Sequence, residues 1–236
     1  MEKQRKITIK FFLNKALAPH TEVDTTLGVI TVQYPVYIQI TYMRKNMQVK
    51  MLHVSYAETI ESIDERVLEL ERRTILQTIR LLQQKQGDRF TLKGLGKYYE
   101  VFGQDFARYL DRYMKDKLGM IASKCEPFHF YLAMDFSTVR ASFNTLYEMC
   151  RKLFDHFEDK LTEEFKTELR YFKEYTRFDR PKHFFDFYTV IDWMDGRAYE
   201  DYQQYLGKTY GYGREEFKAR LKFFLHIIKK QTGNSA

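Results

Sequence analysis

The sequence predicts an α+β fold: a small three-stranded antiparallel sheet, one helix that covers it, and a larger all-helical domain. Three observations predict this order. Short stretches of alternating apolar and polar residues occur before residue 56, the periodicity becomes helical near Ile60, and no strand pattern follows Arg89. We therefore expect a first domain over residues 1–88 and a second over residues 89–236.

The three predicted strands lie at residues 6–13, 36–43 and 47–56. Because side chains alternate faces along a strand, their apolar residues can line one surface of the sheet. Residues 14–26 read as a loop, and residues 28–33 as an edge piece or a bulge, since Pro35 cannot donate to a ladder. Residues 44–46 are the predicted hairpin turn, which places Arg44 and Lys45 at the tip of the sheet.

The other surface of the predicted sheet is basic and amide-rich and contains no carboxylate. It carries Lys6, Thr8, Lys10, Gln39, Thr41, Gln48 and Lys50. Such side chains suit phosphate oxygens and base edges in a nucleic-acid groove. The pattern fits an ordinary solvated face equally well, because antiparallel sheets often bury only one side.

A covering helix is predicted from Ile60 to the stop at Gly87 and Asp88. Its apolar residues recur at helical spacing, including Ile63, Val67, Leu70, Ile75, Ile79 and Leu82. This stripe can pack on the apolar face of the sheet.

The later helical region is rich in aromatic residues between 128 and 178. Helical spacing of aromatic side chains is typical of a core, and the alternative is a surface that binds a partner protein. Near the end, residues 198–205 are a predicted helix that ends at Gly207, a turn follows at 210–213, and a last helix runs from Arg214 to Lys230.

The spacing of the cations along that last helix predicts a basic ridge. At 100° per residue its cations fall within an arc of about 80°, with Glu215 and Glu216 expected to point elsewhere. The ridge consists of Arg214, Lys218, Lys222 and Lys229.

Positive charge is concentrated at the two ends of the chain, whose net charge is +7. Residues 1–54 contain eight cations and three carboxylates, and residues 207–236 contain seven cations and two carboxylates. Each end thus carries +5 and the middle carries −3. This distribution suits a polyanion held at two places, although basic ends also favour solubility.

No pattern of residues indicates an enzyme, a metal site or a cofactor. None of the six histidines forms a paired ligand spacing, and Gly94-Leu95-Gly96 lacks the third glycine of a dinucleotide site. Asp186, Asp192 and Asp195 read as helix-cap or surface groups. Cys125 and Cys150 are expected to be reduced, packed thiols, and no small-molecule substrate is evident.

No run of 18 or more apolar residues occurs, and the first residues lack a secretory apolar segment. We expect a soluble, cytoplasmic protein without membrane contact.

Two segments resemble the phage-type tyrosine recombinases, or integrases, of mobile genetic elements. Ile7-Thr8-Ile9-Lys10-Phe11-Phe12-Leu13, followed by residues 34–42, is similar to the start of their arm-type DNA-binding domain. Residues 198–206, a glycine turn and residues 219–225 resemble the last helices of their core-binding, SAM-like domain, and this likeness is strongest over residues 184–230.

The resemblance implies binding of double-stranded DNA during site-specific recombination, with possible self-association on the DNA. It does not imply cleavage, because no histidine begins the His-x-x-Arg element that the family's catalytic domain requires. In the family that domain follows the core-binding domain and would begin after Lys230, so we expect a chain without it, either the N-terminal part of an integrase or a truncated relative. The alternatives are a protein-interaction or structural module and, for the sheet, RNA in place of DNA.

Overall fold

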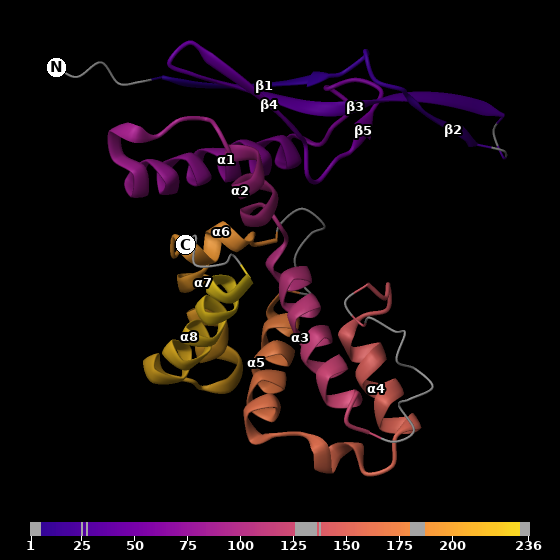
Figure 1. Ribbon diagram of the computed structural model, residues 1–236, viewed down its shortest axis with the longest axis vertical. Coiled ribbons are helices and arrows are strands. Elements are labelled where there is room, and N and C mark those ends of the chain that lie inside the picture. Colours follow the sequence, from indigo (N-terminus) through magenta and orange to yellow (C-terminus); the bar gives the residue numbers. More distant parts are fainter. Residues whose placement is uncertain are drawn as a thin grey trace. The chain divides into compact units, whose positions relative to one another are not determined.

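The computed structural model of the 236-residue chain describes residues 6–24, 26, 28–125, 136, 138–179 and 187–231. It confirms an α+β fold, with an antiparallel sheet first and a mostly helical region after it (Figure 1). The chain divides into two compact units, Met1–Gln104 and Asp105–Ala236. The first unit thus includes residues 89–104, which the sequence analysis assigned to the second domain.

The sheet contains five strands, not the three expected. They are β1 (Ile7–Leu13), β2 (His20–Asp24), β3 (Val29–Tyr42), β4 (Lys45–Lys50) and β5 (Tyr56–Ala57). Each of the other four pairs with β3 in antiparallel fashion. The residues expected to form a loop at 14–26 therefore include a strand, and residues 29–33 are part of β3 rather than a separate edge piece.

Pro35 lies inside β3 because its missing donor falls where no partner strand needs it. The β1 ladder ends at the pair Leu13–Val36, one residue before the proline position is reached. The Pro35 carbonyl accepts from the Asn14 N–H at 2.8 Å, so the absent N–H of Pro35 would face the same side, just past that ladder. A long strand can therefore continue through the proline.

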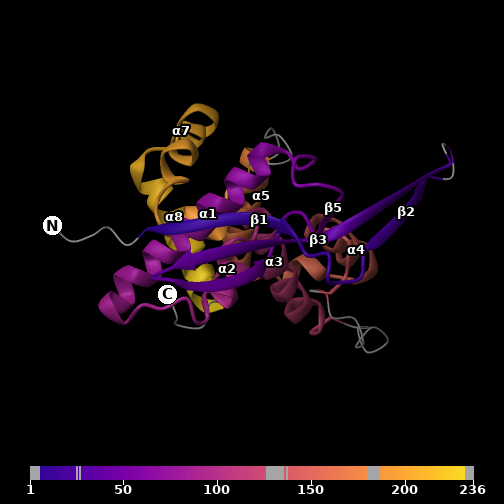
Figure 2. The same ribbon diagram turned by 90° about the horizontal axis from the view of Figure 1, so that it is seen from above.

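Beyond Pro35, β2 and the first half of β3 form a two-stranded ribbon that extends away from the rest of the sheet (Figure 2). Val23, Ile30 and Val32 on this ribbon are exposed, at 56%, 66% and 41% of their accessible surface. These three share one face, since Val23 pairs with Ile30 and Val32 is two residues further along. The ribbon thus presents apolar side chains to solvent.

Two helices, α1 (Glu65–Gln86) and α2 (Leu95–Phe102), lie on the apolar face of the sheet, and η1 (Gly87–Arg89) follows α1 (Figure 1). The expected helix thus begins at Glu65, capped by the Asp64 side chain, and ends before Gly87 as predicted. At α2 the approach to β4 is close: a Cβ on Gly96 would lie 3.2 Å from the Met47 Cε. Glycine at this position lets α2 pack directly on the strand.

A buried carboxylate ties these elements together. Glu71 of α1 is fully buried and accepts from the backbone N–H groups of Leu52 and His53, both at 2.9 Å. Its oxygens also bind the His53 ring nitrogen Nδ1 at 2.9 Å and the Tyr99 hydroxyl of α2. Burial, together with this carboxylate, raises the pKa of Tyr99, so its phenol remains a donor. One side chain therefore joins both helices to the loop after β4.

Replacing Glu71 with alanine should lower the free energy of unfolding of the first unit by about 3 kcal/mol, because several buried donors lose their acceptor. Urea unfolding measures this. The control is Glu69→Ala on the exposed side of α1, which should cost less than about 1 kcal/mol. Faster amide exchange at Leu52 and His53 in the Glu71 variant alone would support the assignment, and equal costs for the two variants would contradict it.

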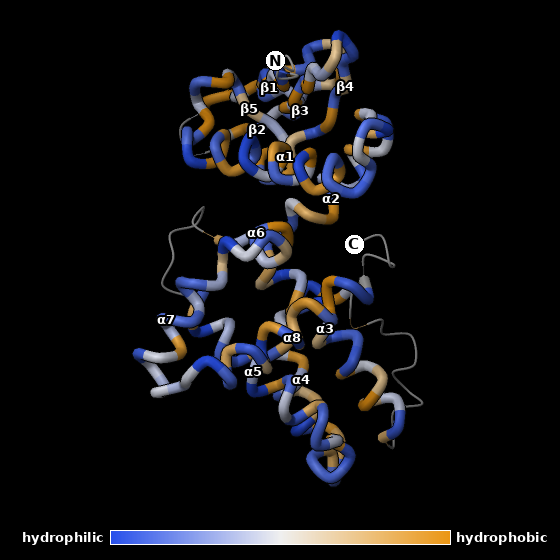
Figure 3. Tube along the Cα trace, turned by 90° about the vertical axis from the view of Figure 1, so that its left-hand side faces the viewer, coloured by the Kyte–Doolittle hydropathy of each residue, from blue (hydrophilic) through white to orange (hydrophobic). Residues whose placement is uncertain are grey.

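The second unit consists of helices that carry both polar and apolar residues along their length (Figure 3). They are α3 (Phe106–Ala122), α4 (Phe143–Leu153), η3 (Phe157–Lys160), α5 (Glu163–Asp179), α6 (Val190–Met194), α7 (Tyr199–Tyr210) and α8 (Arg214–Gln231). α3 packs against both α4 and α5, and α8 packs against α6 and α7. The expected last helix is confirmed, whereas α7 continues through Gly207 to Tyr210 and is capped by Gly211, which has a positive φ of 69°.

Aromatic side chains form the core of this unit, and the predicted core residues Phe143, Phe165 and Phe172 are buried. Trp193 is fully buried, and its ring centroid lies 4.9 Å from that of Phe224 and 5.1 Å from that of Phe106. Tyr175 and Tyr202 contact the same cluster. These edge-to-face and tilted arrangements bring α3, α5, α6, α7 and α8 together around one indole.

A buried ion pair joins α5 to α8 beside that core. The Arg220 guanidinium donates to both oxygens of Glu174, at 2.7 and 3.0 Å, and lies over the rings of Tyr171 and Tyr212 at 4.6 and 4.4 Å. Both charges are at least 96% buried, with exposed fractions of 3% and 4%. Breaking such a pair is strongly destabilising because it leaves one charge uncompensated.

Other sequence expectations for this unit have mixed outcomes. Asp192 forms the capping box of α6 with Thr189, as expected of a helix-cap group, and Cys125 and Cys150 are free, buried thiols. Asp186, and much of the aromatic segment between residues 126 and 137, lie outside the described residues.

The Tyr109 phenol predicts a dependence of stability on alkaline pH. Its hydroxyl is buried and has no hydrogen-bond partner among the described residues, and burial raises its pKa to about 12. The unfolded phenol ionises near pH 10, so stability should be fully present below pH 10 and be lost as pH rises to 12. In Tyr109→Phe the decline over this range, measured by urea unfolding, should be shallower, with little change at pH 7. An unchanged decline would contradict the burial of the hydroxyl.

Candidate nucleic-acid interface

The strand register aligns polar side chains of β1, β3 and β4 in three rows on the face of the sheet opposite α1. The rows are Thr8–Thr41–Asn46, Lys10–Gln39–Gln48 and Phe12–Tyr37–Lys50. No element described within the first unit covers this face, which we call the outer face (Figure 1). The structure thus brings six of the seven predicted sheet-face residues together, and the exposed Lys6 immediately precedes β1.

The polar groups of the outer face are accessible and partly pre-oriented. Lys10, Gln48 and Lys50 are exposed, and Gln39 and Thr41 are half-buried between their neighbours. The Thr41 hydroxyl donates to the Asn46 Oδ1 at 2.7 Å. Because this bond occupies the amide oxygen, the two N–H donors of Asn46 remain for a ligand.

Carboxylates are absent from the three rows of the outer face. Beyond the three rows, β2 and β3 continue the same face onto the ribbon. Among the described side chains, the first carboxylate on that continuation is Glu22, which pairs with Thr31. The central rows therefore have a positive potential that no acid within them offsets.

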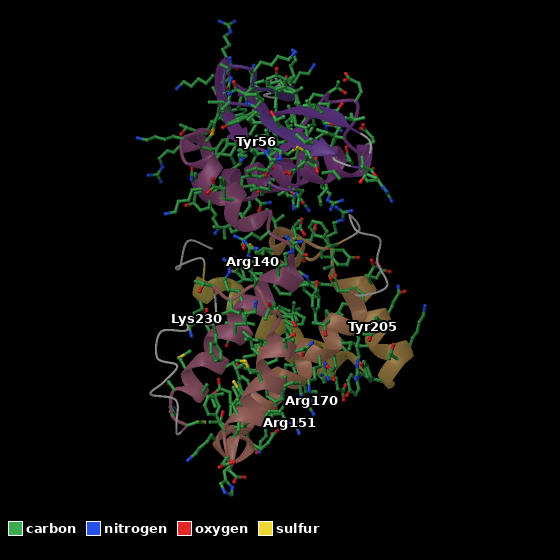
Figure 4. The ribbon with its side chains drawn as sticks, turned by 90° about the vertical axis from the view of Figure 1, so that its right-hand side faces the viewer. Tyr56, Arg140, Arg151, Arg170, Tyr205 and Lys230 are labelled. Carbon is green, nitrogen blue, oxygen red and sulfur yellow. The ribbon has the colours of Figure 1, made fainter. Side chains whose placement is uncertain are left out.

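Aromatic rings lie within the third row and beside it, and sequence reasoning missed them. The ring centroids of Phe12 and Tyr37 are 6.1 Å apart, and the Lys50 ammonium lies 5.3 Å from the ring of Tyr56, which is labelled in Figure 4. His20 also contacts Tyr56, with 5.5 Å between ring centroids. The signal was present in the alternation, since Phe12 is two residues after Lys10 and Tyr37 is two residues before Gln39.

At the tip of the sheet, the structure separates the two predicted cations. The turn consists of Met43 and Arg44, which both have positive φ, 49° and 62°, rather than of residues 44–46. Lys45 is the first residue of β4 and pairs with Tyr42, so it belongs to the alternation of the opposite face. Arg44 is therefore the cation within the turn, and Lys45 follows it as the exposed first residue of β4, so assigning Lys45 to the turn itself was wrong.

Replacing Arg44 with glycine should raise the free energy of unfolding of the first unit by about 1 kcal/mol, because glycine adopts a left-handed backbone without a steric cost. Urea unfolding measures this. Lys45→Gly is the matched control: it also removes one cation, but it lies in a strand and should lower stability. Destabilisation by Arg44→Gly would contradict the turn geometry.

The predicted ridge on α8 is exposed, but one of its four cations is paired with a carboxylate, which the spacing of the residues did not indicate. Lys218 pairs with Glu215 at 2.6 Å, so the expectation that Glu215 points elsewhere was wrong. The hydrogen bond from Lys218 lowers the pKa of Glu215, which therefore stays ionised. Glu216 does point away and accepts from the Gly213 N–H. The ridge residues are Arg214, Lys218, Lys222 and Lys229, and all four are exposed.

A second set of cations in the same unit was missed. Arg170, Lys173 and Arg177 are exposed on α5 and fall within an arc of about 60°. Arg170, labelled in Figure 4, lies over the ring of Tyr171 at 5.4 Å, and Lys173 lies over Tyr147 at 5.5 Å. Their spacing of three and four residues could have indicated this stripe, which the aromatic residues between them obscured.

Within the described ranges, no group of three or more His, Cys, Asp or Glu side chains could hold a metal ion. No helix among these residues is both long and apolar enough to cross a membrane. Comparisons with protein-family models, curated proteins and solved structures found no match to this chain.

Proposed function

We propose that this chain binds double-stranded DNA, in the cytoplasm, through the outer face of its N-terminal sheet, and that it does not cleave the DNA. The observation that carries the proposal is the outer face itself. Lysine, amide and hydroxyl side chains form aligned rows there, no carboxylate occurs in those rows, and no described element of the unit covers them.

The dimensions of the outer face suit a duplex groove. Neighbouring strands lie about 4.8 Å apart, so β1 and β4 are separated by about 10 Å across β3, compared with about 12 Å for the major groove. Gln39 and Gln48 are adjacent in one row and can each offer a donor and an acceptor to a base edge. Lys10, Lys50 and Arg44 would hold phosphates on either side.

The biological role follows from the resemblance to integrases. We propose that the chain occupies recombination sites of a mobile element, with the outer face on one DNA segment. Arg214 and Lys222 of α8, together with the α5 stripe, would contact a second segment and could support self-association on the DNA. In this proposal no residue of the chain is catalytic.

Reversing two charges on the outer face tests the proposal. Lys10→Glu with Lys50→Glu should weaken binding to duplex DNA by at least about tenfold, because each replaces a phosphate contact by repulsion. Lys93→Glu with Lys97→Glu is the matched control, since both lysines are exposed in the same unit and lie outside the strands of the sheet. Fluorescence anisotropy with a labelled duplex measures affinity, and circular dichroism verifies the fold.

The same titrations at several salt concentrations test the mode of binding. The logarithm of affinity should fall linearly with the logarithm of salt, by roughly 0.9 for each phosphate neutralised, and the outer-face variant should lose roughly 1.8 of that slope. Equal affinities for the two double variants, or a flat salt profile, would contradict the proposal. A duplex RNA of the same sequence should bind more weakly, because its deep, narrow major groove excludes the sheet.

A protein-binding role is the second candidate, and the ribbon favours it. Val23, Ile30 and Val32 form an exposed apolar face there, whereas most aromatic residues first considered for a partner-binding surface are buried in the second unit. Exposed contiguous apolar residues are typical of protein-interaction sites. Because these residues lie outside the three rows of the outer face, binding to DNA and to a protein can be measured independently.

A further inference from the structure

A pocket of about 830 Å³ lies in the second unit between α3, the start of α4 and the end of α5. Its volume is within the range of about 300–1,000 Å³ that is typical of small-molecule sites. Ala107, Val139 and Phe172 supply apolar wall, and Asn144 and Thr176 supply polar groups. The charged side chains of the pocket determine which ligand it can accept.

Cations outnumber carboxylates in this pocket by four to two. The cations are Arg108, Arg112, Lys115 and Arg140, and the carboxylates are Asp111 and Asp179. The pocket therefore has a surplus of two positive charges, which favours an anion.

One ion pair of the pocket, between Lys115 and Asp111, stabilises the wall of the pocket. Lys115 is 7% exposed, pairs with Asp111 at 2.8 Å and donates to the Val139 carbonyl at 3.2 Å. Asp111 in turn accepts from the Phe143 N–H at 2.8 Å. These bonds hold the segment before α4 against α3, so neither charge is available to a ligand.

The remaining positive charge belongs to arginines that line the pocket. Arg112 and Arg140 are exposed, and among the described residues neither is paired with a carboxylate. Arg108 is one helical turn before Arg112, on the same face of α3, and lies 3.6 Å from Asp105. Arg140, labelled in Figure 4, comes from the segment that Lys115 fixes in place. Two guanidinium groups from separate segments therefore border one pocket.

We propose that this pocket binds a nucleotide, with Arg112 and Arg140 holding its phosphate groups. Guanidinium groups donate paired N–H bonds that match phosphate oxygens, and neither Arg112 nor Arg140 is paired with a described acid, although Asp179 lines the same pocket. The volume of the pocket can accept the base and sugar beside Ala107, Asn144 and Thr176. A base-paired duplex cannot insert its bases, so this site is independent of the DNA-binding face proposed above.

Isothermal titration of the full chain with ATP, AMP, adenosine and inorganic phosphate tests the proposal. ATP and AMP should bind with dissociation constants below about 1 mM, and adenosine should bind at least about tenfold more weakly than AMP because it lacks the phosphate. Inorganic phosphate should bind more weakly than AMP, since it leaves the apolar wall empty. Absence of AMP and ATP binding, or adenosine binding as tight as AMP, would overturn the proposal.

Variants locate the binding. Arg112→Gln with Arg140→Gln should weaken AMP binding by at least about tenfold, whereas Arg80→Gln with Arg89→Gln, the control with the same charge change at exposed positions outside the pocket, should not. Equal affinities would overturn the proposal, as would displacement of AMP by duplex DNA, which would show that the pocket receives backbone phosphates. Lys10→Glu with Lys50→Glu should leave AMP binding unchanged, so failure of the DNA proposal is distinguishable from failure of this one.

Discussion

The first unit depends on one long strand, because each of the other four strands of its sheet pairs with β3. The register on β3 determines which residues of β1 and β4 share a face. A slip of one residue would turn Ile38 and Ile40, both fully buried, toward the face that now carries Gln39 and Thr41. Hydrophobic burial under α1 and α2 therefore sets the chemistry of the opposite, solvent-facing surface, although none of the buried residues belongs to that surface.

The fold class could be predicted because alternation and helical spacing are local patterns. The differences arose where a tertiary partner overrides a local rule. Pro35 argued for an interruption, yet its missing donor falls just past the end of the β1 ladder. His20–Asp24 contains a single strongly apolar residue, and its strand depends on pairing with β3. Glu71 lies on the apolar stripe of its helix, four residues after Val67 and four before Ile75, and only the donors of distant residues explain a carboxylate there.

In the candidate interface, too, some residues could be predicted from local sequence patterns, and others depend on contacts that the sequence does not show. The lysines and amides of the outer face could be predicted from the alternation of side chains along each strand. The same alternation could have predicted their aromatic neighbours Phe12 and Tyr37. On α8 the spacing was sufficient to place Lys218 and Lys222 outside the core, but not to reveal that Glu215 neutralises Lys218 or that Arg220 is buried against Glu174. Helical spacing predicts the direction in which a side chain points, but not its distance from an opposite charge. Whether two charges form a pair depends on that distance.

The close approach of α2 to β4 has a practical meaning for dissecting the chain. A fragment that stops at residue 88 would keep every strand and α1, yet it would strip Met47 and Val49 of the helix seated on them through Gly96. Such a fragment would expose apolar surface that is buried in the full chain. Its non-specific association with other molecules could be mistaken for specific binding. A fragment meant to report on the sheet alone should therefore run to Gln104, where the first compact unit ends.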